Sequence, residues 1–363
     1  MDEPLFSQFN QLFTESLENA IKDLSEEDQQ KLAKLDDADF RKMLEDTTDS
    51  VSSLFIKDVN KLSRKDYFED KKYKKGFEGR LLKIYEPYFV ELHGLITTCV
   101  EAMQHHRDYM HGEKILKNKK QANQYGVLVR LHARALRICN EISSLMQAGY
   151  GTGALARWRA LHELVTTISY LAKNPDATAL FLEHNKVLSY KAMLDYNFYS
   201  KELKVKPFTG REVGLAKRTY NAVITKYGKS FEHDYGWLRV YSNNKLNNFR
   251  DIEEQYGQKQ LRPYYRYASY GIHANSKSLF SGEENNALEG QEVLLIGASD
   301  SGMEEVAQLT PISISYATIT ILTGVYVSAG SLIMAKVLML KQAELEKVFS
   351  EIDLPDAMNK DES

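Results

Sequence analysis

The chain has 363 residues, of which 43% are hydrophobic and 27% charged, so it is long enough to bury a full core and to form two or three domains. Its net charge of -3 excludes a general attraction to nucleic acids or membranes, and any such attraction must come from a local patch. Its two cysteines show no CxxC spacing, which excludes a disulfide framework and a cysteine zinc site.

The first region, residues 1–75, is predicted to form short amphipathic helices that bind a regulatory protein partner or cap the rest of the chain. Six apolar side chains of its opening segment share one helical face: Phe6, Phe9, Leu12, Phe13, Leu17 and Ile21. The same segment is acidic and lacks the cationic start and apolar core of a signal peptide, so we expect a cytoplasmic protein. The charge-dense segment 64–80, RKDYFEDKKYKKGFEGR, indicates a solvated linker.

Residues 76–350 are predicted to form one helical domain, followed by an acidic tail at 351–363. Long stretches show apolar residues at a period of 3.6, the chain has only seven prolines, and no run shows convincing period-2 alternation. The fold class is therefore all-α, and the helices are expected to assemble into a bundle.

Two consecutive helices form the centre of this predicted bundle. The first is expected to direct Leu128, Leu131, Ala135, Ile138, Ile142 and Leu145 inward and to end at the YGTG of residues 150–153. The second is expected to bury Leu155, Trp158, Leu161, Val165, Ile168 and Leu171 and to end at Asn174-Pro175.

The segment 309–335 contains no charged residue and is long enough to cross a bilayer. Against a membrane span, it holds several serines, threonines and two glycines, and no cationic flank precedes it. We favour a buried central helix over a membrane span.

A basic, aromatic-rich insertion at about 201–260 interrupts the bundle pattern. Residues 201–250 hold eleven Lys or Arg against four Asp or Glu, a net charge of +7. Cations interleaved with rings suit phosphates and stacked bases, which indicates RNA binding by Lys217, Arg218, Lys226, Lys229, Tyr235, Trp237 and Arg239. The other interpretation is an irregular insertion whose rings pack on the bundle and whose lysines face solvent. The sequence favours neither.

Three stretches in order, residues 134–174, the EHNK of 183–186 and the YRYASYGIHANSKSLF of 265–280, resemble the bacterial domain-of-unknown-function family numbered 5677. The resemblance covers roughly residues 120–340. The usual features of that family are an arginine and a glutamate on one helix and a serine and a histidine on a later one, which here are Arg159, Glu163, Ser269 and His273.

That family is similar to the HEPN helical bundles, many of which are metal-independent ribonucleases of toxin and antiphage systems. Their signature is an arginine, four to six residues and a histidine, at a site formed where two protomers meet. Here Arg266 and His273 enclose six residues. The resemblance thus implies a HEPN-like bundle, a homodimer and RNA as the substrate.

Helical spacing supports the same residues independently of the family. Positions seven apart are separated by almost two turns, so Arg266, Tyr270 and His273 form one stripe, with Ser269 beside it. Metal-free RNA cleavage needs a base for the 2′-hydroxyl, an acid for the leaving oxygen and positive charge on the phosphate, which histidine and arginine supply. The alternative is a histidine on a packed helix, with tyrosines filling the core. One turn apart, Arg159 and Glu163 are expected to pair with each other or to orient Arg266 and His273.

We therefore expect a metal-independent endoribonuclease effector of a bacterial antiphage or toxin system. It acts on RNA, with tRNA as one candidate, needs no cofactor and recognises no DNA sequence. No metal is expected, since His162-Glu163 lacks the second histidine of HExxH because Thr166 stands there. Two alternatives stay open: a non-catalytic helical interaction or sensor protein of a defence system, and a membrane-associated defence effector built on residues 309–335.

Overall fold

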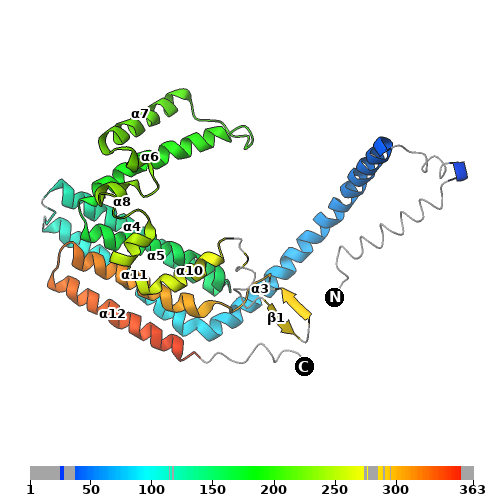
Figure 1. Cartoon of the computed structure of the whole chain (residues 1–363). Coiled ribbons are helices and arrows are strands. Elements are labelled where there is room, and N and C mark those ends of the chain that lie inside the picture. The colour runs from blue at the N-terminus through cyan, green and yellow to red at the C-terminus, as the bar shows by residue number, and fades with distance from the viewer. Residues whose placement is uncertain are drawn as a thin grey trace. The chain divides into compact units, whose positions relative to one another are not determined.

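The computed structural model describes residues 25–27, 37–113, 115–116, 118–273, 276, 285–288, 291–294 and 296–352. It is built of helices apart from one short two-stranded hairpin, which confirms the all-α class (Figure 1). Two compact units meet at Tyr73 and Lys74. The predicted amphipathic helix of residues 6–21 and the acidic tail beyond residue 352 lie outside the described residues.

A single helix, α3 (Asp37–Gly112), spans the boundary between the two units. The predicted solvated linker at 64–80 holds this boundary, and its residues 64–76 are exposed, but the chain stays helical through it. Residues 37–73 of the first region form one long helix instead of several short ones. Opposite charges at helical spacing, such as Lys65 and Glu69 with 3.9 Å between Nζ and Oε1, are compatible with a solvated helix. In the second unit α3 turns one face to the core: Phe77, Leu81, Tyr85, Tyr88 and Leu92.

The core of the second unit lies between α3, α4 (Lys119–Gln147), α5 (Gly151–Lys173) and α11 (Met303–Gly324). The predicted inward stripe of α5 is confirmed at all six positions, and that of α4 is buried at four, with Leu131 and Leu145 partly exposed. The turn between these two helices needs glycine, because Gly149 has φ +77° and a Cβ on Gly151 would collide with the carbonyl oxygen of Ser301. The predicted stop at Asn174-Pro175 is also confirmed.

The uncharged segment 309–335 forms parts of two helices and not one. α11 ends at Gly324, and α12 (Ala329–Ser350) begins after Ser328, whose side chain accepts a hydrogen bond from the Ser331 N–H in a capping box. Of the described helices, α11 is the one long and apolar enough to cross a bilayer, and 67% of its apolar window is buried inside the bundle. This burial agrees with the interpretation as a central helix.

The region between α5 and α11 is also mostly helical. α6 (Ala177–Phe198) and α7 (Gly210–Tyr227) form a hairpin that Figure 1 shows standing away from the bundle. Shorter elements follow: η1 (Lys229–Glu232), α8 (Gly236–Tyr241), α9 (Phe249–Tyr256), η2 (Lys259–Leu261) and α10 (Arg262–Tyr270). Strands β1 (Asn285–Leu288) and β2 (Gln291–Leu294) then pair antiparallel, a feature that the sequence did not predict.

Candidate functional site

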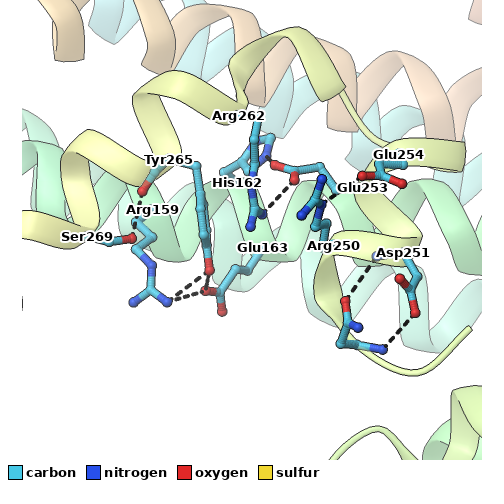
Figure 2. Close-up of polar contacts among 11 residues, drawn as sticks. Arg159, His162, Glu163, Arg250, Asp251, Glu253, Glu254, Arg262, Tyr265 and Ser269 are labelled. Carbon is cyan, nitrogen blue, oxygen red and sulfur yellow. Dashed lines mark hydrogen bonds and ion pairs between the residues drawn. The ribbon is translucent and has the colours of Figure 1, made fainter.

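Helices α9 and α10 pack on one face of α5 and bring a set of polar side chains together (Figure 2). α5 contributes Arg159, His162 and Glu163, which its period places on adjoining positions of one side. α10 begins at Arg262-Pro263, where proline costs no intrahelical hydrogen bond. The first two turns of α10 thus contact both neighbours, Arg262 through Glu253 of α9 and Tyr265 through Arg159 and Glu163 of α5.

A first group of contacts centres on the hydroxyl of Tyr265. It donates a hydrogen bond to Glu163 Oε1 at 2.7 Å and accepts one from Arg159 Nη2 at 2.9 Å, while that guanidinium lies 3.3 Å from the same carboxylate oxygen. The predicted pairing of Arg159 with Glu163 is thus present, but the pair orients Tyr265 and not Arg266 or His273. Burial, together with the Glu163 carboxylate, raises the pKa of Tyr265 to about 12, so its hydroxyl stays protonated near neutral pH.

The ring of Tyr265 is held as firmly as its hydroxyl. The guanidinium carbon atoms of Arg159 and Arg262 lie 4.8 and 5.0 Å from the ring centroid, within the range of cation–π contacts. The ring of Phe249 on α9 stacks on it at 5.1 Å. Tyr265 therefore fixes α10 to both α5 and α9, a role that its place in a tyrosine-rich stretch did not reveal.

The second group, which we call the relay, is a hydrogen-bonded chain of His162, Glu253 and Arg262, of which the first two are buried and Arg262 is partly exposed. His162 Nε2 lies 2.7 Å from Glu253 Oε1, and Arg262 Nη1 donates to Glu253 Oε2 at 2.7 Å. The side chains of His162 and Glu253 are 0% and 1% exposed, so the carboxylate is compensated entirely by these two partners. The Nδ1 atom of His162 is buried and has no partner among the described residues, so Nε2 is the ring nitrogen that bonds the Glu253 carboxylate.

Sequence reasoning missed this relay, although one signal was present. Glu253 occupies a position on α9 where apolar residues recur at helical spacing, namely Phe249, Ile252 and Tyr256. A carboxylate inside such a stripe is rarely buried without a cationic or donor partner. His162 was considered only as half of a metal motif, and among the described residues no group of three His, Cys, Asp or Glu side chains could hold a metal.

The predicted catalytic stripe is only partly present. α10 ends at Tyr270 because the chain leaves the helix at Gly271, so His273 lies three residues beyond it, with its N–H bonded to Ser269 O at 3.1 Å. The expectation of one continuous helical stripe through His273 is therefore wrong. Ser269 donates its hydroxyl to Tyr265 O at 2.7 Å, a local bond within the helix, and Tyr270 is half-buried.

Arg266 and His273 differ from all of these polar neighbours. Both side chains are exposed, and neither forms a hydrogen bond or ion pair with any other residue that the structure describes. This exposure excludes the alternative interpretation, in which His273 packs in the core. Arg266 within α10 and His273 just beyond its end are therefore free, whereas Arg262, Tyr265 and Ser269 of the same helix are bonded within the fold.

The basic insertion resolves into two parts. Its rings pack inward: Trp237 is 4% exposed and meets Tyr170 and Phe181 edge-on at 5.6 and 5.2 Å, so its predicted stacking on a base is wrong. Tyr235 is half-buried, and burial raises its pKa to about 12. The predicted cations Lys217, Arg218, Lys226 and Lys229 are exposed, whereas Arg239 is half-buried with its Nε atom enclosed.

Removing the hydroxyl of Tyr265 tests how tightly α10 is fixed. We expect Tyr265→Phe to lower the free energy of unfolding by about 1 kcal/mol, because Arg159 and Glu163 lose a shared partner but remain paired and partly solvated. Urea unfolding followed by circular dichroism measures the change. The adjacent Tyr264 is 41% exposed, and Tyr264→Phe is the matched control. Equal effects of the two substitutions would contradict the assigned role.

A family model matches residues 125–287, from within α4 to β1, and its description is a family of unknown function (DUF5677). The match includes α5, α9 and α10 and thus both groups of contacts. The chain shows no significant similarity to curated proteins or to solved structures. The predicted resemblance to family 5677 is confirmed over these residues, and the HEPN-like character of the bundle stays a prediction.

Proposed function

We propose that this chain, whose residues 125–287 match the DUF5677 family model, is a metal-independent endoribonuclease with Arg266 and His273 at its site. The observation that carries the proposal is their free, exposed state beside a helix that Tyr265, Glu253 and their partners hold in place. Fixed support with free reactive groups is what positioned catalysis requires.

The chemistry follows from what these two side chains can do. His273 takes the proton of a 2′-hydroxyl, whose oxygen then attacks the adjacent phosphorus. Arg266 offers two parallel N–H donors to the phosphate oxygens, where negative charge builds up. The bond from phosphorus to the 5′-oxygen breaks, which leaves a 2′,3′-cyclic phosphate and a 5′-hydroxyl once that oxygen gains a proton.

The last proton makes a second copy of the chain part of the proposal. Each chain offers one such histidine, and a single base cannot be protonated and unprotonated at the same moment. A second His273 across a homodimer, or a water molecule, supplies the proton to the leaving oxygen. The context that the HEPN resemblance implies is a cytoplasmic effector of a bacterial antiphage or toxin system, with tRNA among the candidate substrates.

The test is cleavage of total RNA and of tRNA by the purified full-length chain in EDTA. We expect new 5′-hydroxyl ends, which a polynucleotide kinase labels without prior phosphatase treatment, and cyclic phosphates at the 3′ ends. His273→Ala and Arg266→Ala should each lower the rate by at least about a hundredfold, the usual range for a lost proton-transfer group or charge donor.

The matched controls are His111→Ala and Arg134→Ala, which remove an exposed histidine and an exposed arginine elsewhere on the same chain. Both should cleave like the wild type. Intact RNA with the wild-type protein across these substrates, or cleavage that survives His273→Ala, would refute the proposal.

A further inference from the structure

The connection between α6 and α7 carries a group of exposed apolar side chains. We call residues 196–211 the hairpin tip. From Lys201 to Glu212 every residue is exposed, and Phe198, Leu203 and Tyr199 are 75%, 61% and 53% exposed. Tyr196, Val205 and Phe208 add further exposed apolar surface. Single exposed apolar residues are ordinary, but a contiguous group of this kind marks a binding surface.

The tip is nevertheless held in one conformation. The side chain of Asn197 donates to Phe208 O at 3.2 Å and accepts the Phe208 N–H at 2.8 Å, which ties the two ends of the connection together. Val205 N–H donates to Ser200 O at 3.0 Å within it, and Thr209 begins α7 with a capping box. Side chains displayed on a fixed backbone lose less entropy on binding than those of a loose loop.

The charge of the tip is strongly positive. Residues 196–211 contain four cations, Lys201, Lys204, Lys206 and Arg211, against the single acid Glu202. None of the four cations forms an ion pair with a residue that the structure describes. An anionic partner with flat apolar groups would pair with these cations and stack on the exposed rings.

We propose that the hairpin tip binds single-stranded RNA, with its rings stacked on bases and its lysines on phosphates. The inference rests on the proposed ribonuclease function for the choice of ligand. Exposed rings and lysines that form no ion pair with a described residue stand on one short segment, and single-stranded nucleic acids are bound by this combination of stacking groups and cations. A membrane-surface segment of this composition is typically an amphipathic helix, whereas residues 199–209 are not helical. In this proposal the exposed rings of Phe198 and Tyr199 take the stacking role that the sequence had assigned to Tyr235 and Trp237.

Binding is measured by fluorescence anisotropy with a labelled oligouridylate, on the full-length His273→Ala variant so that the probe stays intact. Joint replacement of Phe198 and Tyr199 by alanine should weaken binding by about tenfold or more, the usual loss for stacked bases. Joint replacement of Lys201, Lys204 and Lys206 by glutamate should weaken RNA binding further. It should also make the decrease of the logarithm of the binding constant with the logarithm of the salt concentration less steep, by about 2 in the slope.

The matched controls lie on α3, where Phe68→Ala removes a ring that is 56% exposed, and a triple change of Lys71, Lys72 and Lys75 to glutamate alters charge equally. Both should bind RNA like the parent variant. RNA binding that is unchanged in the tip variants would overturn the inference. So would tip-dependent binding to vesicles of phosphatidylserine and phosphatidylcholine without binding to RNA, which would identify a lipid surface.

The two proposals can fail separately. If the wild type cleaves RNA and the tip variants bind and cleave like the wild type, the inference is wrong and the ribonuclease function stands. If the wild type cleaves nothing but tip-dependent RNA binding is observed, the catalytic proposal is wrong and the inference stands. Melting temperatures of the tip variants should equal that of the parent, because the replaced side chains are exposed.

Discussion

Replacing Glu253 with alanine is expected to lower the free energy of unfolding by about 3–5 kcal/mol, the usual loss when one partner of a buried ion pair is removed. The carboxylate is 1% exposed and accepts hydrogen bonds from both His162 and Arg262. Without it, the Nε2–H of His162 and a guanidinium that is 28% exposed face no acceptor. Chemical unfolding followed by circular dichroism measures the loss, and the RNA cleavage that we propose should fall with it because α9 and α10 loosen from α5.

Glu254 provides the matched control, since it is the next residue of α9. Its side chain is 54% exposed and pairs with Arg250 one turn earlier, with 2.8 Å between Nε and Oε1. An exposed pair of this kind contributes little, so Glu254→Ala should cost less than about 0.5 kcal/mol. Glu253→Gln should fall between the two, because its amide oxygen still accepts one hydrogen bond. Equal losses for Glu253→Ala and Glu254→Ala would contradict the assigned role of the relay.

The central helices could be predicted from the sequence because periodicity reports burial directly. All six positions chosen for α5 are buried, since one apolar stripe at a period of 3.6 has only one way to face a core. Its end at Asn174-Pro175 follows from local backbone chemistry alone. Charge density located the solvated connection at 64–80, where the two units divide, but charge density does not break a helix, and these residues continue α3. The absence of charge in residues 309–335 likewise did not indicate a single helix, because α11 ends at Gly324 and Ser328 caps the start of α12.

Only the local contacts of the candidate site could be predicted from the sequence. Arg159 and Glu163 are one turn apart, so their pairing is a local property that spacing predicts. Their shared partner Tyr265 lies about a hundred residues later, and only the packing of α10 on α5 brings it near. Extending the helical spacing of α10 to His273 failed because the helix ends at Tyr270. Gly271 follows, and glycine loses more conformational entropy in a helix than other residues do.

The same tertiary packing leaves a histidine in the core whose titration can be measured. His132 of α4 lies between α4 and α11, where its Nε2 is 2.8 Å from the Thr318 hydroxyl. Burial lowers its pKa from the ordinary 6.5 to about 4, because the charged form cannot be solvated there. Burial also lowers the pKa values of His106 and His184. All three histidines therefore favour folding in their neutral form.

We expect the folded state to lose stability as the pH falls from 6.5 toward 4. In that window the unfolded chain carries a proton on His132 that the native protein does not bind, so the free energy of unfolding rises with pH. The stabilisation is fully present above pH 6.5, and the His132 contribution lost by pH 4 is about 3 kcal/mol. Below pH 4 both states bind the proton and this residue adds no further slope.

His132→Gln separates this effect from the titration of carboxylates, which changes stability over an overlapping range. Glutamine can still bond Thr318 but does not titrate, so the variant should lose about 3 kcal/mol less than the wild type between pH 6.5 and pH 4. Urea unfolding at a series of pH values measures both curves, with His111→Gln as the control for an exposed histidine. Parallel curves for the wild type and His132→Gln would mean that His132 is solvated in the native protein, and the close packing of α4 on α11 would then be wrong.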